Sequence, residues 1–164
     1  MGNIVRISRS FIDYWAIGGG ILLFAVVFMN ALSVGLNIFW NPISGDVELT
    51  EMGVAVGVFA FLPYCQLHYS NVSADIFTSR ASPSFLCAIK AIASIFAIIL
   101  AILLFWWMFK GMVDRYNFNY LSAILLIPMW IPFAPVLLSL VLLMVASTLT
   151  LIENLSPILA NKVT

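Results

Sequence analysis

Long apolar stretches separated by a few charged residues form the main pattern of the chain. Four stretches of 32, 23, 19 and 37 residues contain no Asp, Glu, Lys or Arg: 14–45, 52–74, 91–109 and 116–152. About 20 residues of helix are enough to cross the hydrocarbon core of a bilayer. Because backbone amides inside that core must be paired within their own segment, helices are the expected form. The pattern predicts four transmembrane helices in a single domain covering residues 1–164, at about 14–38, 49–69, 85–109 and 129–152.

Composition agrees with a membrane protein. Apolar residues make up 63% of the chain, charged residues only 9%, and the formal net charge is zero. Soluble domains carry about a quarter charged residues, so this chain lacks the polar surface that a soluble domain needs. A neutral chain also gives no indication of nucleic acid as a partner. The expected fold class is therefore an all-α integral membrane protein.

The basic residues predict the orientation of the helices. Five of the seven lie on one predicted side of the membrane: Arg6, Arg9, Arg80, Lys90 and Lys162. The remaining two are Lys110 and Arg115, which lie on the opposite side. Cytoplasmic loops carry an excess of Lys and Arg, so both termini are predicted to be cytoplasmic.

Side chains that could carry catalysis are scarce. The chain has one histidine, His68, and two cysteines, Cys65 and Cys87, without a CxxC spacing. A bis-histidine haem site needs two histidines, and no nucleophile has an evident base partner. We therefore predict no catalytic, cofactor-binding or metal-binding residue in this chain, and no enzymatic activity.

Small and polar residues instead indicate helix contacts. Asn30, Ser33 and Asn37 recur at i, i+3 and i+7, so they share one face of the first predicted helix. Gly53 and Gly57 form a GxxxG step on the second, which lets two helices approach closely. An ion pathway along the polar face is the alternative. We favour a four-helix subunit that packs, through these residues, against another membrane protein.

Two carboxylates, Glu48 and Glu51, lie near the start of the second predicted helix, which Asp46 is predicted to cap. They are three residues apart and share a helix face. One hypothesis is that they position a partner subunit or a docked protein at the membrane surface. The other is that they only stabilise the positive end of the helix dipole, by about 0.3–1 kcal/mol each. The sequence leaves both open.

Three segments resemble a known family. Ser44–Glu51 reads SGDVELTE, an acidic turn; Asn71–Phe77 reads NVSADIF; and Ile127–Trp130, which reads IPMW, precedes Pro135. These segments are similar to the small membrane subunit of tripartite ATP-independent periplasmic (TRAP) transporters. That family shows a loop of the form (His or Asn)-Val-x-x-Asp-(Ile or Leu)-Phe after its second span. Many members carry Trp-(Ser or Thr)-Glu-Glu at the acidic turn, whereas here two residues, Leu49-Thr50, separate the glutamates.

The resemblance implies a transporter of three components. A large membrane subunit would hold the substrate and sodium sites and move as an elevator. A periplasmic substrate-binding protein would deliver an organic anion, such as a C4-dicarboxylate, a keto acid or an acidic sugar like sialic acid. This chain would anchor the large subunit's scaffold in the bacterial inner membrane, with Asp75 and Arg80 near the partner's inner rim. No cofactor is expected in this chain, because the sodium would lie in the large subunit.

Two other classes of protein remain as alternatives. A membrane-anchor subunit of a redox enzyme could use His68 together with a ligand from an external partner to hold haem. A free-standing small channel or exporter would need no partner. A haem Soret band would indicate the first, and flux through vesicles that contain this chain alone would indicate the second.

Overall fold

The computed structural model describes residues 2–39, 44–68 and 83–160. These residues form four long helices: α1 (Gly2–Phe39), α2 (Asp46–Leu67), α4 (Pro83–Asn117) and α5 (Phe133–Ala160). Each contains a segment long and apolar enough to cross a membrane: Val5–Asn37, Asp46–Leu67, Ile89–Asn117 and Phe133–Asn154. The described part of the chain therefore confirms the predicted all-helical fold with four membrane-capable helices.

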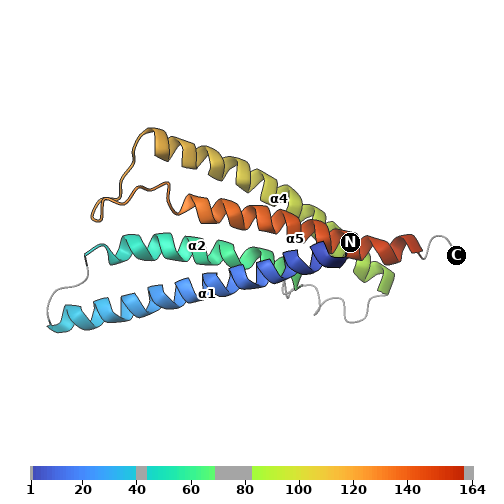
Figure 1. Cartoon of the computed structure of the whole chain (residues 1–164), viewed down its shortest axis with the longest axis horizontal. Helices are drawn as coiled ribbons and strands as arrows, with labels where there is room; N and C mark the ends of the chain where they lie inside the picture. Colours follow the sequence, from blue (N-terminus) through green and yellow to red (C-terminus); the bar gives the residue numbers. More distant parts are fainter. Residues whose placement is uncertain (1, 40–43, 69–82, 161–164) are drawn as a thin grey trace.

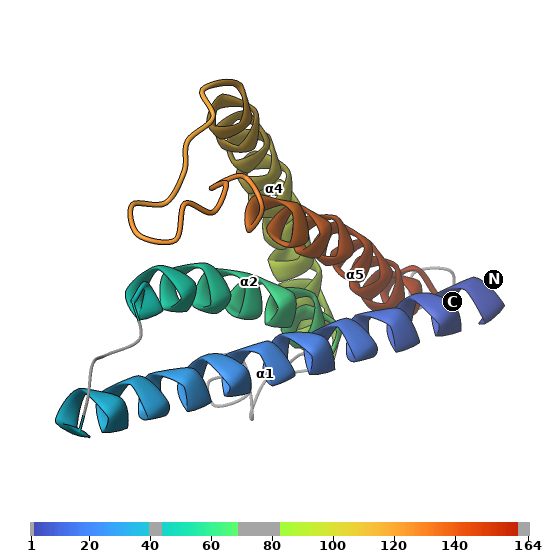
Figure 2. The ribbon, with the colours of Figure 1, turned by 60° about the vertical axis from the view of Figure 1, so that its left-hand side comes forward.

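The helices form two antiparallel hairpins, α1–α2 and α4–α5 (Figure 1). The hairpins join through α2 and α5, so α1 and α4 lie at the outer edges. The start of α1 and the end of α5 lie at the same end of the molecule, where the hairpins come together. Figure 2 shows the hairpins diverging toward the other end. α5 is the most enclosed of the four helices, and the two edge helices are left with wide apolar faces.

α1 is much longer than a bilayer is thick. Its 38 residues span about 57 Å at 1.5 Å per residue, against a hydrocarbon core of about 30 Å. The span predicted at about 14–38 is therefore the C-terminal part of a helix that begins at Gly2. A helix of this length must tilt in the bilayer or project beyond it.

Small residues on α2 bring α1 close to it. A Cβ atom on Gly53 would lie 2.4 Å from Val26 Cγ2, and one on Gly57 would lie 2.5 Å from Leu23 Cγ. Real Cβ atoms do not approach other atoms so closely, so only glycine fits the present packing at either position. The GxxxG step thus packs against α1 of the same chain, through the close helix approach that such residues permit.

A buried polar cluster joins α2 to α4 and α5. The Gln66 side-chain amide donates to Thr150 Oγ1 at 3.3 Å and to Ser94 Oγ at 3.5 Å. The two hydroxyls of Ser94 and Thr150 are themselves 3.1 Å apart. All three residues are buried. Hydrogen bonds of this kind stabilise helix contacts in an apolar environment by about 0.6–2 kcal/mol each, so the cluster ties the two hairpins together.

The start of α5 lies later than the sequence pattern suggests. The last span is predicted to begin at about residue 129, directly after Pro128, whereas the helix begins at Phe133 and has Pro135 in its first turn. Pro128 instead pairs with Leu121 in an isolated antiparallel bridge, and its carbonyl accepts a turn hydrogen bond from Ile131 N–H at 3.2 Å. Proline has no N–H to donate, so it suits such an edge position and the first turn of a helix.

Candidate functional site

The carboxylate of Glu48 holds the segment that connects α4 to α5, residues 118–132, which we call the connector. Ser122 Oγ donates to Glu48 Oε2 at 2.7 Å. The backbone N–H of Ile124 donates to Oε1 at 2.8 Å, and that of Leu125 donates to Oε2 at 3.1 Å. Both oxygens of the carboxylate are therefore engaged. Hydrogen bonds to an ionised group are roughly twice as strong as neutral ones, so Glu48 clamps the connector to the start of α2.

The connector is also paired along its own backbone. Ser122 N–H donates to the Ile127 carbonyl at 2.9 Å, and Met129 N–H donates to the Tyr120 carbonyl at 3.0 Å. The Ser122 hydroxyl, which donates to Glu48, accepts from Ile127 N–H at 3.3 Å. Ser122 is consequently the link between the internal pairing of the connector and the clamp.

Gly45 leaves the space in which the connector packs against the start of α2. It precedes α2 with φ 84°, in the left-handed region that glycine tolerates best. A Cβ atom at this position would lie 2.5 Å from Leu125 Cγ. Gly45 is thus needed both for the backbone conformation and for the space that Leu125 occupies. Its carbonyl accepts from Leu49 N–H at 3.1 Å, the first hydrogen bond of the helix.

The polar face of α1 meets α2 in the same chain. Ser33 Oγ donates to Asp46 Oδ2 at 2.5 Å, and Asn30 Nδ2 donates to Thr50 Oγ1 at 2.8 Å. Thr50 Oγ1 in turn donates to the Asp46 carbonyl at 2.7 Å. Asn37, the third member of the predicted face, is exposed. Two of the three residues therefore hold α1 against α2, and a role for the face in binding a partner stays a prediction.

The two glutamates predicted to act together have different surroundings. Glu48 is partly buried beneath the connector, whereas Glu51 is exposed. Asp46 accepts from Val47 N–H at 2.8 Å, but the residue that precedes the helix is Gly45, without a side-chain cap. Asp75 and Arg80 lie outside the described residues.

Charged pairs link the helices at the opposite end of the molecule. Arg9 on α1 forms an ion pair with Glu153 on α5. His68 Nε2, at the end of α2, lies 2.9 Å from Asp13 Oδ1 on α1, and the His68 ring packs against Tyr64 with a centroid separation of 4.4 Å. The single histidine of the chain is thus engaged with a carboxylate of a neighbouring helix. Within the described residues, no group of three or more His, Cys, Asp or Glu side chains could hold a metal ion.

Besides the Glu48 clamp and the Arg9–Glu153 ion pair, sequence reasoning missed two hydrogen-bonded contacts between uncharged side chains of the hairpins. One is the cluster of Gln66, Ser94 and Thr150, and the other is a hydrogen bond of 2.9 Å from Trp15 Nε1 to Ser139 Oγ. Hydroxyls in apolar helices usually bond to their own backbone, as Ser94 does to the Lys90 carbonyl at 2.9 Å. The one signal that could have revealed the cluster is Gln66, an amide at the end of an apolar stretch.

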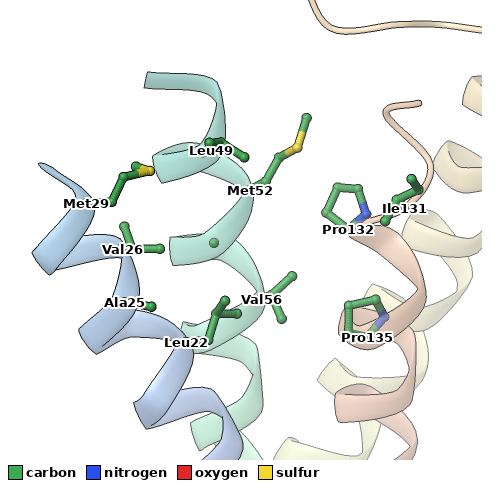
Figure 3. A pocket seen from close by; sticks show the side chains of 11 residues that line it. Leu22, Ala25, Val26, Met29, Leu49, Met52, Val56, Ile131, Pro132 and Pro135 are labelled. Atoms are coloured by element: carbon green, nitrogen blue, oxygen red, sulfur yellow. The ribbon is translucent and has the colours of Figure 1, made fainter. Parts of the chain in front are cut away.

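An apolar groove of about 570 Å³ lies where the hairpins diverge (Figure 3). Its walls come from α1, α2 and the start of α5: Leu22, Ala25, Val26, Met29, Leu49, Met52, Gly53, Val56, Ile131, Pro132 and Pro135. Gly53 is shared between this groove and the α1–α2 contact. The same packing that seats α1 on α2 therefore shapes one wall of the groove.

Comparison with known proteins identifies the family. The family model of the DctQ component of tripartite ATP-independent periplasmic transporters matches residues 21–156. This range includes α2 and α4 completely and most of α5. No curated protein and no solved structure matches the chain. The match agrees with the resemblance of the acidic turn and the entry to the last helix, and the chain belongs to the DctQ family, the small membrane subunits of TRAP transporters.

Proposed function

We propose that this chain is the noncatalytic small subunit of a sodium-coupled TRAP transporter in the bacterial inner membrane. It anchors the static scaffold of the large elevator subunit, which holds the substrate and sodium sites. A periplasmic binding protein delivers an organic anion: a C4-dicarboxylate, a keto acid or an acidic sugar such as sialic acid. The observation that carries the proposal is the family match, which extends from α1 to α5 and so reaches all four membrane-capable helices.

The orientation belongs to the same proposal. Both termini lie in the cytoplasm, and the end that carries the Glu48 clamp faces the periplasm. The support is the excess of basic residues on the side of the termini. The clamp then lies on the surface that the periplasmic binding protein approaches.

The apolar groove is the proposed docking place for the large subunit. Lipid tails are as apolar as leucine, so association within a bilayer must rest on close packing and hydrogen bonds. A concave groove offers more packing area to an inserted side chain or helix than a convex helix face does. Met29 and Met52 in the walls have the flexible side chains that adapt to a partner's shape. The predicted interface residue Gly53 contributes by shaping this wall.

Two matched alanines on α1 test the docking place. Ala25 lines the groove, whereas Ala31 is also exposed but lies outside it. We expect Ala25→Trp to reduce co-purification of the large subunit with the tagged small subunit in mild detergent, and Ala31→Trp to leave it intact. Loss only with Ala31→Trp would place the interface on another face of α1. Full recovery with both variants would mean that the groove holds lipid.

Transport in proteoliposomes tests the function itself. We expect vesicles that contain both membrane subunits to take up the organic anion when the binding protein and an inward sodium gradient are present. Vesicles with the large subunit alone, or with this chain alone, should show no uptake. Flux through this chain alone would support a free-standing channel or exporter instead. A haem Soret band in the purified complex would support the membrane-anchor alternative.

A further inference from the structure

The connector exposes several large apolar side chains. Phe118 is 71% exposed, Leu126 64%, Ile124 58% and Leu121 49%. Several large apolar side chains exposed on one short segment are uncommon on proteins that face water, and they indicate a contact with a membrane or another protein. The connector therefore presents a surface that the fold of this chain alone leaves uncovered.

The backbone of the connector is prepared for an environment with little water. Ser122 N–H donates to the Ile127 carbonyl, and Glu48 accepts hydrogen bonds from the N–H groups of Ile124 and Leu125. These N–H groups would otherwise need water as their acceptor. An unpaired backbone group costs several kcal/mol in hydrocarbon, by order of magnitude. A loop that stays in water has no such requirement, since water can accept from its amides. The Glu48 clamp thus lowers the cost of placing this part of the connector against lipid.

The backbone conformation of Leu126 is a second observation that favours contact between the connector and lipid. It adopts φ 53°, in the left-handed region that is disfavoured for leucine and tolerated by glycine and asparagine. The other left-handed residue of the connector is Asn119, with φ 48°, which is a residue type that suits this conformation. In water, an exposed leucine would gain nothing to offset this backbone cost. Contact with acyl chains would offset it, because burial of a leucine side chain contributes about 1.5–3 kcal/mol.

The flanking side chains are those that occur at the surface of a bilayer. Tyr116 packs edge-on against Trp130 with a centroid separation of 5.9 Å. The Arg115 guanidinium lies 5.4 Å from the Tyr120 ring, and the Lys110 ammonium lies 5.2 Å from the Trp106 ring. Aromatic residues concentrate at the interface between membrane and water. The two cations are complementary to lipid phosphates, and Asp114 is the one acidic residue between them.

We propose that the connector is an interfacial membrane anchor, held in the headgroup region with the Ile124 and Leu126 side chains at the acyl boundary. Amphipathic segments of this kind lie about 5–10 Å into the boundary between headgroups and acyl chains. The lipid surface, rather than a protein partner, is the occupant because the residues that flank the connector include two cations and several aromatic rings, which suit lipid headgroups. Glu48 is the positioning residue, since its carboxylate fixes the depth of the connector relative to α2.

Fluorescence quenching in nanodiscs tests the anchor on the assembled complex. With Cys65→Ser and Cys87→Ser as background, an environment-sensitive probe is attached through Ile124→Cys or, as the matched control, through Asp114→Cys. Both native side chains are exposed. We expect the probe at position 124 to be quenched more by lipids that carry a nitroxide at the start of the acyl chain than by aqueous iodide. The probe at position 114 should show the reverse order.

Each result decides the proposal. Iodide quenching at position 124 equal to that at position 114 would show a connector in water and overturn it. Protection from both quenchers would show a protein partner and overturn it as well. A second pair of variants separates folding from insertion: Leu126→Asn relieves the backbone, and Leu126→Met retains the apolar side chain. We expect Leu126→Asn to lower lipid quenching at position 124 and Leu126→Met to preserve it. The readout is depth, so its outcome is independent of whether the complex transports.

Discussion

Glu48 accepts a hydrogen bond from Ser122 at 2.7 Å although 74 positions separate the two residues in the chain. The contact joins the start of α2 to the segment that leads into α5, at the end of the molecule where the hairpins diverge. Together with the bonds from the Ile124 and Leu125 amides, it makes one carboxylate responsible for the position of the connector.

Replacement of this carboxylate should loosen the connector. Glu48→Gln removes the charge and turns an N–H₂ group toward donors, so we expect the complex to lose about 1–3 kcal/mol of stability. Limited proteolysis of the complex in nanodiscs at Phe118 and Tyr120 should become faster. The control is Glu51→Gln, because Glu51 is exposed and outside the clamp. Equal effects of the two variants would mean that both glutamates act only on the helix dipole.

The glycines of the GxxxG step should stabilise the contact between α1 and α2 within this chain. Gly57→Leu would force a side chain into the space of Leu23, so we expect α1 to separate from α2. Disulfide formation between Asn30→Cys and Thr50→Cys, introduced where the native side chains are 2.8 Å apart, measures the separation. Cross-linking should fall in Gly57→Leu and persist in Gly18→Leu, since a Cβ atom on Gly18 meets nothing within 4 Å. Unchanged cross-linking in Gly57→Leu, with loss of the large subunit, would assign the glycines to the partner interface.

The buried polar cluster should stabilise the contact between hairpins. Thr150→Val removes the hydroxyl that Gln66 and Ser94 share, and we expect a loss of about 0.6–2 kcal/mol in a detergent unfolding titration. Thr148→Val is the matched control, because Thr148 is exposed and its hydroxyl donates only to the Val145 carbonyl at 2.8 Å. If both variants unfold alike, the cluster adds nothing beyond helix packing.

Topology can be checked independently of the partner. The excess of basic residues on the side of the termini predicts cytoplasmic ends and a periplasmic connector. Reporter fusions after Lys162 and next to Asp114 should therefore report opposite sides of the membrane. The same side for both would rule out the four-span arrangement, and opposite sides in the reverse sense would invert the proposed orientation.

Sequence patterns alone determined the number and kind of the helices. Uncharged stretches of 19 to 37 residues indicate spans because crossing hydrocarbon requires continuous apolar sequence, which is a local property. The acidic turn, the NVSADIF segment and the IPMW segment likewise indicated the family that the match over residues 21–156 confirmed. The ends of the helices were harder to predict from the sequence. α1, for example, continues to Gly2 through residues that suit a helix both inside and outside a bilayer.

Only the tertiary structure decided what each polar or small residue contacts. Asn30, Ser33 and Gly57 have the chemistry of any close helix contact, and nothing local distinguishes a neighbour in the same chain from a helix of a partner. Glu48 shows the limit most clearly. Its position in the sequence left a partner contact and helix-dipole stabilisation both open, whereas its donors come from residues 74 to 77 positions away in the same chain. Such pairings depend on how the hairpins are placed in space, and that placement follows from packing over the whole chain.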